Sequence, residues 1–249
     1  LGMAIIDKSC FMLFPFMPHS LRAEVNRRIF DNHDLRDDNT LPPWSEVVAL
    51  QIFRGILQGV RALHDCKYSH RDIKLENVLF VNANDLSTPV LMDFGSVGPL
   101  TQSIQERRHT LLIAETASSH TTMPYRPPEL FEGGVRTGDA DVDFAKVDVW
   151  SLGCTLFGIL YGASPFESEF NRRTGAIRIV DCSQLRVIGN VPAPPKDTGP
   201  SKWYSSQMQS LITWILNQDR LKRPSLDEVT QKVDGLLASR DGNHLDMLL

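Results

Sequence analysis

The order of apolar and polar residues predicts a chain rich in helices, with a few short strands before residue 95. The apolar run Cys10–Phe14 predicts a buried strand, and Pro15–Pro18 is expected to end it as a stiff connector. Two more strands are expected at Val78–Val81 and Val90–Met92, on either side of a polar turn.

Apolar residues at helical spacing predict the longer helices. Pro42-Pro43 is expected to open one of them, because proline is tolerated in a first helical turn. Its buried face is predicted to hold Phe53, Ile56, Leu57, Val60 and Leu63. Apolar residues occupy nearly every side of Val147–Tyr161, so this helix is expected to be buried all round.

The remaining segments are shorter or more polar. Further helices are predicted at Leu21–Phe30 and Gln207–Leu216. The capping box Ser225–Glu228 predicts a helix that runs to about Leu237. Irregular structure is expected at residues 31–39, 95–122 and 196–201.

Composition narrows the class of protein. The 249 residues suffice for one large domain or two small ones. A net charge of −4 gives no electrostatic reason to expect nucleic-acid binding. The four cysteines lie far apart in the sequence, which favours a reducing compartment over a disulfide framework. No signal peptide and no uncharged apolar run of membrane-spanning length is visible.

The candidate chemistry lies in His-Arg-Asp-Ile-Lys-Leu-Glu-Asn at His70–Asn77 and in the Asp-Phe-Gly that begins at Asp93. Phosphoryl transfer needs a carboxylate to receive the hydroxyl proton, a cation near the transferred group and oxygen ligands for magnesium. Asp72 suits the first role and Lys74 the second. Asn77 and Asp93 suit the third, because the strand pair between them is expected to return the chain to one metal site. The alternative interpretation is a polar loop with capping side chains.

Further motifs follow in a fixed order. They are Tyr125-Arg126-Pro127-Pro128-Glu129, Asp148–Gly153 and Arg223-Pro224. Together with the two earlier stretches they resemble the C-lobe of eukaryotic protein kinases, from about residue 18 onward. Leu91–Ser96 and the segment after it resemble the Numb-associated kinase family, nearest its branch of myristoylated and palmitoylated Ser/Thr kinases.

This resemblance implies an α+β, protein-kinase-like fold with a mainly helical C-lobe and a truncated N-lobe. It divides the chain into 1–17, a remnant of N-lobe strands and hinge; 18–240, the C-lobe; and 241–249, a C-terminal tail. The implied function is transfer of the ATP γ-phosphate to protein Ser/Thr hydroxyls with Mg²⁺. The implied partner is a protein substrate, and no nucleic acid is expected.

The resemblance also assigns roles to residues. Asp72 would be the catalytic base and Lys74 the cation beside the γ-phosphate, while Asn77 and Asp93 would hold magnesium. At the adenine side, Leu79 would pack beneath the ring, although ordinary core packing explains this residue as well.

Other roles concern the hinge and the substrate platform. Phe14 would be the gatekeeper, with core packing again the alternative, and Pro15 and Met17 would belong to the hinge. Thr122 would lie near the base, as in kinases selective for Ser/Thr. Glu129 would form a buried, structural ion pair with Arg223.

Several side chains have expected structural roles. Asp148 would anchor the catalytic loop by accepting backbone N–H groups, and His70 would pack against Phe94. Packing is expected to order the segment after Asp93 without phosphate; the alternative is that Arg71 grips a phosphorylated residue such as Ser118. In the first case Thr110 would cap a short helix that docks through Leu111–Ala114.

The chain departs from the family at its beginning. No Gly-x-Gly-x-x-Gly precedes residue 70, and no strand lysine or helix glutamate is recognisable there. We therefore expect an N-terminally truncated copy of an active kinase, inactive as this fragment alone. A catalytically dead, kinase-like binding module is the alternative, and a small-molecule kinase of related fold is a third. The resemblance implies a cytoplasmic protein, with attachment to Golgi or other endomembranes through lipidation outside this chain.

Overall fold

The computed structural model describes residues 2–31, 42–82 and 85–245. Its helices are α1 Leu21–Asn26, α2 Glu46–Asp65, α3 Arg107–His120, α4 Phe144–Tyr161, α5 Gln184–Val187, α6 Gly199–Lys202, α7 Ser206–Ile215 and α8 Leu226–Leu245. Its strands are β1 Gly2–Ile6, β2 Ser9–Leu13, β3 His19–Ser20, β4 Tyr68–Ser69, β5 Val78–Phe80, β6 Val90–Leu91, β7 Gly98–Pro99, β8 Thr101–Gln102, β9 Val142–Asp143, β10 Ser168–Phe170 and β11 Ile177–Ile179.

Helix α4 is the centre of the core. All but two of its residues are buried, which confirms the prediction of a helix buried all round. By length and composition alone it could cross a membrane, but 89% of it is buried inside the protein, as in a core helix. The helix ends at Gly162, whose φ of 104° is a conformation that glycine adopts without steric cost.

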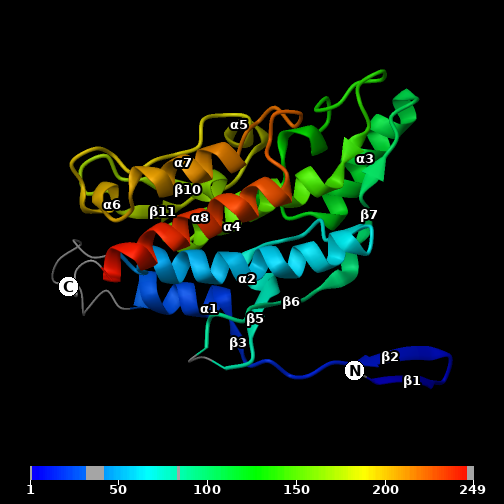
Figure 1. Cartoon of the computed structure of the whole chain (residues 1–249). Helices are drawn as coiled ribbons and strands as arrows, with labels where there is room; N and C mark the ends of the chain where they lie inside the picture. Colours follow the sequence, from blue (N-terminus) through cyan, green and yellow to red (C-terminus); the bar gives the residue numbers. More distant parts are fainter. Residues whose placement is uncertain (1, 32–41, 83–84, 246–249) are drawn as a thin grey trace.

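Three further helices pack around this centre. Helix α2 contacts both α4 and α8, and α7 contacts α4; Figure 1 shows α8 lying along α2. The predicted face of α2 is buried at Phe53, Ile56, Leu57 and Val60, whereas Leu63 is half-buried. The prediction that Pro42-Pro43 opens this helix was wrong, because the helix begins at Glu46 and the Ser45 hydroxyl caps it.

The C-terminal helices differ from expectation mainly at their ends. The capping box before α8 is confirmed, since Glu228 N–H donates to the Ser225 hydroxyl and Ser225 N–H donates to the Glu228 carboxylate. Helix α8 continues to Leu245, beyond the predicted end. The predicted connector 196–201 was partly wrong, because the short helix α6 begins at Gly199.

A three-stranded antiparallel sheet, in the order β3-β5-β6, carries the chain from the predicted loop to the Asp-Phe-Gly motif. This confirms both predicted strands near residues 78 and 90. Leu79 pairs with Ser20 on one side and Val90 on the other. One residue before the strand, the Asn77 carbonyl accepts from Met92 N–H at 3.0 Å, which sets the metal-site candidates side by side.

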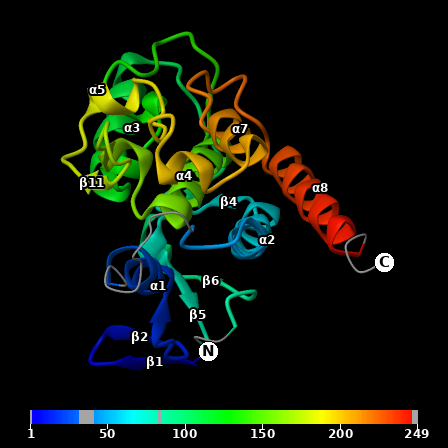
Figure 2. The ribbon, with the colours of Figure 1, turned by 90° about the vertical axis from the view of Figure 1, so that its left-hand side faces the viewer.

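The N-terminal residues form an antiparallel hairpin, β1–β2, that lies outside the helical body in both Figure 1 and Figure 2. All five residues of β2 are exposed, so the prediction of a buried strand at Cys10–Phe14 was wrong. Met3 and Ile5 are each 71% exposed and Phe14 is 62% exposed. The apolar run thus predicted the strand correctly but not its exposure.

Helix α1 confirms the first part of the predicted helix Leu21–Phe30, and the π-helical turn Arg27–Asp31 continues it. The polar loop predicted after it lies, from residue 32 on, outside the described residues. The prediction that residues 95–122 are irregular was wrong, because α3 occupies fourteen of them. Helix α3 docks through Ile113 and Ala117 onto a second apolar cluster, whose other members are Ile104, Leu130, Val135, Val142, Phe144 and Val147.

Candidate active site

The loop His70–Asn77 is suspended from one buried carboxylate. Asp148, on α4, accepts the N–H of His70 at 2.9 Å and the N–H of Arg71 at 2.8 Å. His64 Nε2 lies 2.8 Å from the same carboxylate. Because Asp148 is fully buried, these partners replace the water it has lost, and they fix the loop to the core helix as the sequence predicted.

Asp72 lies at the centre of the site, in contact with three of the predicted residues, Lys74, Asn77 and Thr122. Lys74 Nζ donates to its Oδ2 at 2.7 Å, and the Thr122 hydroxyl donates to its Oδ1 at 2.7 Å. Thr122 N–H donates to the same Oδ1 at 3.0 Å, and Lys74 Nζ also lies 2.8 Å from the Thr122 hydroxyl. The structure thus brings base, cation and threonine candidates into one hydrogen-bonded triangle.

These contacts decide the charge of Asp72. Burial acts to raise the pKa of its carboxyl group, but hydrogen bonds from Lys74 and Thr122 and the Lys74 charge outweigh it and lower the pKa. Asp72 is therefore ionised at neutral pH and can accept a proton. Stability from these contacts is present above the ordinary pKa of 3.8 and is lost as the pH falls through the lowered value.

Asn77 and Asp93 supply oxygen atoms of the kind that Mg²⁺ binds. The Asn77 amide nitrogen donates to the Asp72 carbonyl at 2.8 Å and to Asp72 Oδ2 at 3.2 Å, which leaves its amide oxygen free to face a metal. Asp93 is exposed and has a φ of 62°, and its carboxylate accepts a long bond of 3.3 Å from Gly95 N–H. This donor set fits a divalent ion. Among the described residues, no group of three or more His, Cys, Asp or Glu side chains gathers as a metal cluster.

His70 and Phe94 link the two motifs. Their ring centroids lie 5.5 Å apart, which confirms the predicted packing, and His70 Nε2 lies 3.0 Å from the Met92 carbonyl. The His70 ring therefore holds the residues before and after Asp93 against the loop.

The adenine-side residues lie in different surroundings. Leu79 is half-buried in β5, whereas Phe14 and Pro15 are exposed and Met17 is half-buried. Core packing does not account for Phe14, and the adenine-binding roles of these four residues stay predictions.

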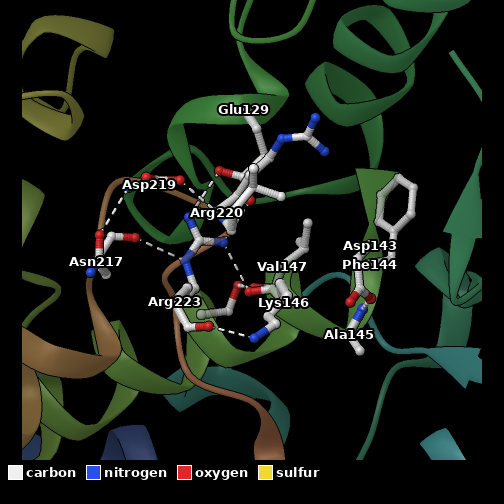
Figure 3. Close-up of polar contacts among 12 residues, drawn as sticks. Glu129, Asp143, Phe144, Ala145, Lys146, Val147, Asn217, Asp219, Arg220 and Arg223 are labelled. Atoms are coloured by element: carbon white, nitrogen blue, oxygen red, sulfur yellow. Dashed lines mark hydrogen bonds and ion pairs between the residues drawn. The ribbon is translucent and has the colours of Figure 1, made fainter. Parts of the chain in front are cut away.

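Glu129 and Arg223 form a buried ion pair, which Figure 3 shows with the residues around Arg223. Arg223 Nη1 and Nη2 donate to the two Glu129 oxygens at 2.5 and 2.9 Å. The rest of the guanidinium donates to the carbonyls of Asn217 and Lys146. Both partners are buried, and the Arg223 guanidinium also lies over the Trp150 ring, so this pair has the structural role that was predicted.

Arg71 has an environment that the sequence did not reveal. Its guanidinium lies 3.8 Å from the centre of the Phe144 ring and donates to the Pro99 carbonyl at 2.7 Å. Burial lowers its pKa, with Asp148 acting in the opposite direction. The backbone of Gly98 approaches so closely that an added Cβ would lie 2.4 Å from the guanidinium carbon. Only the glycine at this position could have signalled such a close approach.

Helix α3 differs in detail from the expected docking. It begins at Arg107, so Thr110 lies inside it and donates to the Arg107 carbonyl in place of capping the helix. Leu111 and Leu112 are about half-exposed, whereas Ile113 is 2% exposed. The prediction of docking is therefore correct for Ile113 alone among the apolar residues of that run.

Comparisons with known proteins agree with this geometry. The protein kinase domain family matches residues 7–233. Serine/threonine-protein kinase 16 of Rattus norvegicus is 28% identical over 235 residues, which cover 94% of this chain and 68% of that protein. Serine/threonine-protein kinase ppk13 of Schizosaccharomyces pombe is 33% identical over 168 residues, which cover 67% of this chain and 44% of that protein. Because the family match spans most of the chain, this protein belongs to the protein kinase domain family and has its mixed helical and strand fold.

Proposed function

We propose that this chain is the catalytic part of a Ser/Thr protein kinase that moves the γ-phosphate of ATP to protein hydroxyls. The observation that carries the proposal is the triangle of Asp72, Lys74 and Thr122. Membership of the chain in the protein kinase domain family supports the use of ATP and a divalent metal ion. The names of the relatives support serine and threonine as acceptors.

In this proposal each residue has one task. The ionised Asp72 orients the substrate hydroxyl and receives its proton, as a general base. Lys74 places a positive charge beside the transferred group, and its bond to Thr122 keeps it in position. Asn77 and Asp93 would hold the metal ion, proposed here to be Mg²⁺, which when bound offsets phosphate charge.

Activation is proposed to depend on packing. The Arg71 guanidinium is engaged by Phe144 and Pro99, and Ile113 docks α3 on the second apolar cluster. Activity should therefore survive complete dephosphorylation, checked by mass spectrometry. Loss of activity that returns with phosphate on Ser118 would contradict this part of the proposal.

The finer assignments rest on resemblance. We propose membership of the Numb-associated kinase family, the branch of myristoylated and palmitoylated kinases, and a cytoplasmic, endomembrane-attached location through lipidation. The division into 1–17, 18–240 and 241–249 stays a prediction, with α8 extending to Leu245 across its last boundary.

The test is transfer of radiolabelled γ-phosphate to three peptides that differ only in Ser, Thr or Tyr. It uses the 249-residue chain and an extended protein, defined as this chain joined at Leu1 to a segment with a Gly-rich loop and strand lysine. We expect metal-dependent transfer to Ser and Thr by the extended protein, and a loss of about 100-fold or more in Lys74→Met. An extended protein that folds and binds ATP but transfers nothing would leave the binding-module function in its place.

A further inference from the structure

A hollow of about 370 Å³ lies beside Lys74 and Thr122 of the candidate site. Lys74 and Thr122 line one end, and Glu167 and Ile179 line the other. Glu167 and Ile179 also line a second hollow, of about 490 Å³, beside β11. The two hollows therefore meet at Glu167 and Ile179, between the candidate site and the β10–β11 hairpin.

The charges in the first hollow cancel with one exception. Arg22 Nε is paired with Glu76 at 2.7 Å and Arg22 Nη1 donates to the Gly162 carbonyl at 2.6 Å, while Lys74 is paired with Asp72. Glu167 has no basic side chain within ion-pair distance among the described residues. Its Oε1 accepts the N–H of Ser164, at 3.0 Å.

The surroundings of Glu167 favour a cation that arrives from outside. Glu167 is half-buried, and burial raises the pKa of its carboxyl group, because water is replaced without a charged partner. The charged groups that face it are Arg22 and Glu76, which neutralise one another. Arg126 and Arg186 donate to the backbone carbonyls of Thr121 and Phe166, and neither forms an ion pair with Glu167 among the described residues.

Part of the lining of the first hollow, next to Glu167, is apolar. Ile179 is 55% exposed and Tyr125 is buried beneath the hollow. A long basic side chain buries its aliphatic stem on such a surface while its charged end meets a carboxylate. β11 pairs only with β10 among the described strands, so its outer edge offers free backbone groups to an extended peptide.

We infer that Glu167 is a specificity residue that binds a lysine or arginine of the substrate protein, in an extended segment lying along β11 within a few residues of the phosphorylated Ser or Thr. This inference rests on the proposed kinase function. Arg22 then competes with a basic side chain of the substrate, because its guanidinium already pairs with Glu76, the second carboxylate that lines the hollow.

The test uses serine peptides of otherwise neutral sequence, with Arg, norleucine or Glu placed at each position in turn. Norleucine retains the aliphatic stem and removes the charge. Binding to the 249-residue chain is followed by fluorescence anisotropy, and kcat/KM is measured with the extended protein. We expect Arg to exceed norleucine by about five- to tenfold at one position. Glu167→Gln should abolish this preference, because it removes the negative charge. The variant should still fold, since glutamine accepts from Ser164 N–H and keeps the cap.

Two further variants complete the test. Glu169→Gln lies on the same hairpin, paired with Arg178 and outside the first hollow, and should retain the preference. Arg22→Gln releases Glu76 and should increase the preference, which keeps the inference testable if Glu167→Gln fails to fold. An arginine preference equal in wild type and Glu167→Gln, or no preference at all, overturns the inference. Binding preference without phosphoryl transfer would instead contradict the kinase function and leave this binding site in place.

Discussion

Four carboxylates at and near the candidate site fall into two groups with opposite environments: Glu129 with Asp148, and Asp72 with Asp93. Glu129 and Asp148 are buried and fully partnered, by a bidentate arginine in one case and by backbone N–H groups and His64 in the other. Asp72 is buried but contacts the mobile end of the Lys74 side chain, which can move to a substrate. Asp93 is exposed and accepts a long hydrogen bond from Gly95 N–H. The first group holds the scaffold and the second is available for chemistry, although all four residues are acids.

The largest expected effect separates the groups by function. Asp72→Asn should lower kcat of the extended protein by about 10²–10⁴-fold, because the amide cannot accept the hydroxyl proton. ATP affinity should change little, because in this proposal Asp72 contacts the substrate hydroxyl and not the nucleotide. Steady-state kinetics and ATP titration check this, and turnover like that of the wild type would remove Asp72 from the role of base.

The next effect concerns the buried group. Glu129→Ala should cost about 3–5 kcal/mol in the free energy of unfolding, because it leaves the buried Arg223 charge unpaired. The matched control is Asp234→Ala, which breaks the exposed α2–α8 pair with Arg54 and should cost about 0–1 kcal/mol. Urea denaturation measures both, and equal losses would contradict the assignment of Glu129 to the scaffold.

Two neighbours on α3 extend the comparison from acids to apolar residues. Ile113→Ala should destabilise the docked helix by about 2 kcal/mol, because Ile113 is buried in the second cluster. Leu112→Ala should cost no more than about 0.5 kcal/mol, since Leu112 is 51% exposed. Hydrogen exchange of the α3 amides is the measurement, and similar exchange in the two variants would show that Ile113 does not dock the helix.

The smallest effect is expected at Asp93. Removing its carboxylate in Asp93→Ala should reduce the gain in nucleotide affinity on adding Mg²⁺ by about tenfold, because Asn77 alone is uncharged. Asp93→Asn is the matched variant, which keeps an acceptor for Gly95 N–H and removes only the charge. ATP is titrated with and without Mg²⁺; a wild-type magnesium effect in both variants would exclude Asp93 as a ligand.

Sequence reasoning located most of the site because its residues are close in the chain. Asp72, Lys74 and Asn77 lie on one loop, and the short strands β5 and β6 return Asp93 to it through local pairing. The sequence did not predict the contact of Arg71 with Phe144 or the ion pair of Arg22 with Glu76. These partners are distant in sequence, and no periodic pattern links them.

The sequence by itself determined the helical core, the catalytic loop and the family. Its period of apolar residues fixes which face of α2 is buried, and the composition of α4 leaves it no exposed face. Only the tertiary structure decided that β2 is exposed, that Ile113 rather than Leu111 or Leu112 docks α3, and that Glu167 has no basic partner among the described residues. The physical reason is that propensity and period act over one turn or one strand, whereas burial and charge pairing depend on which distant surfaces meet.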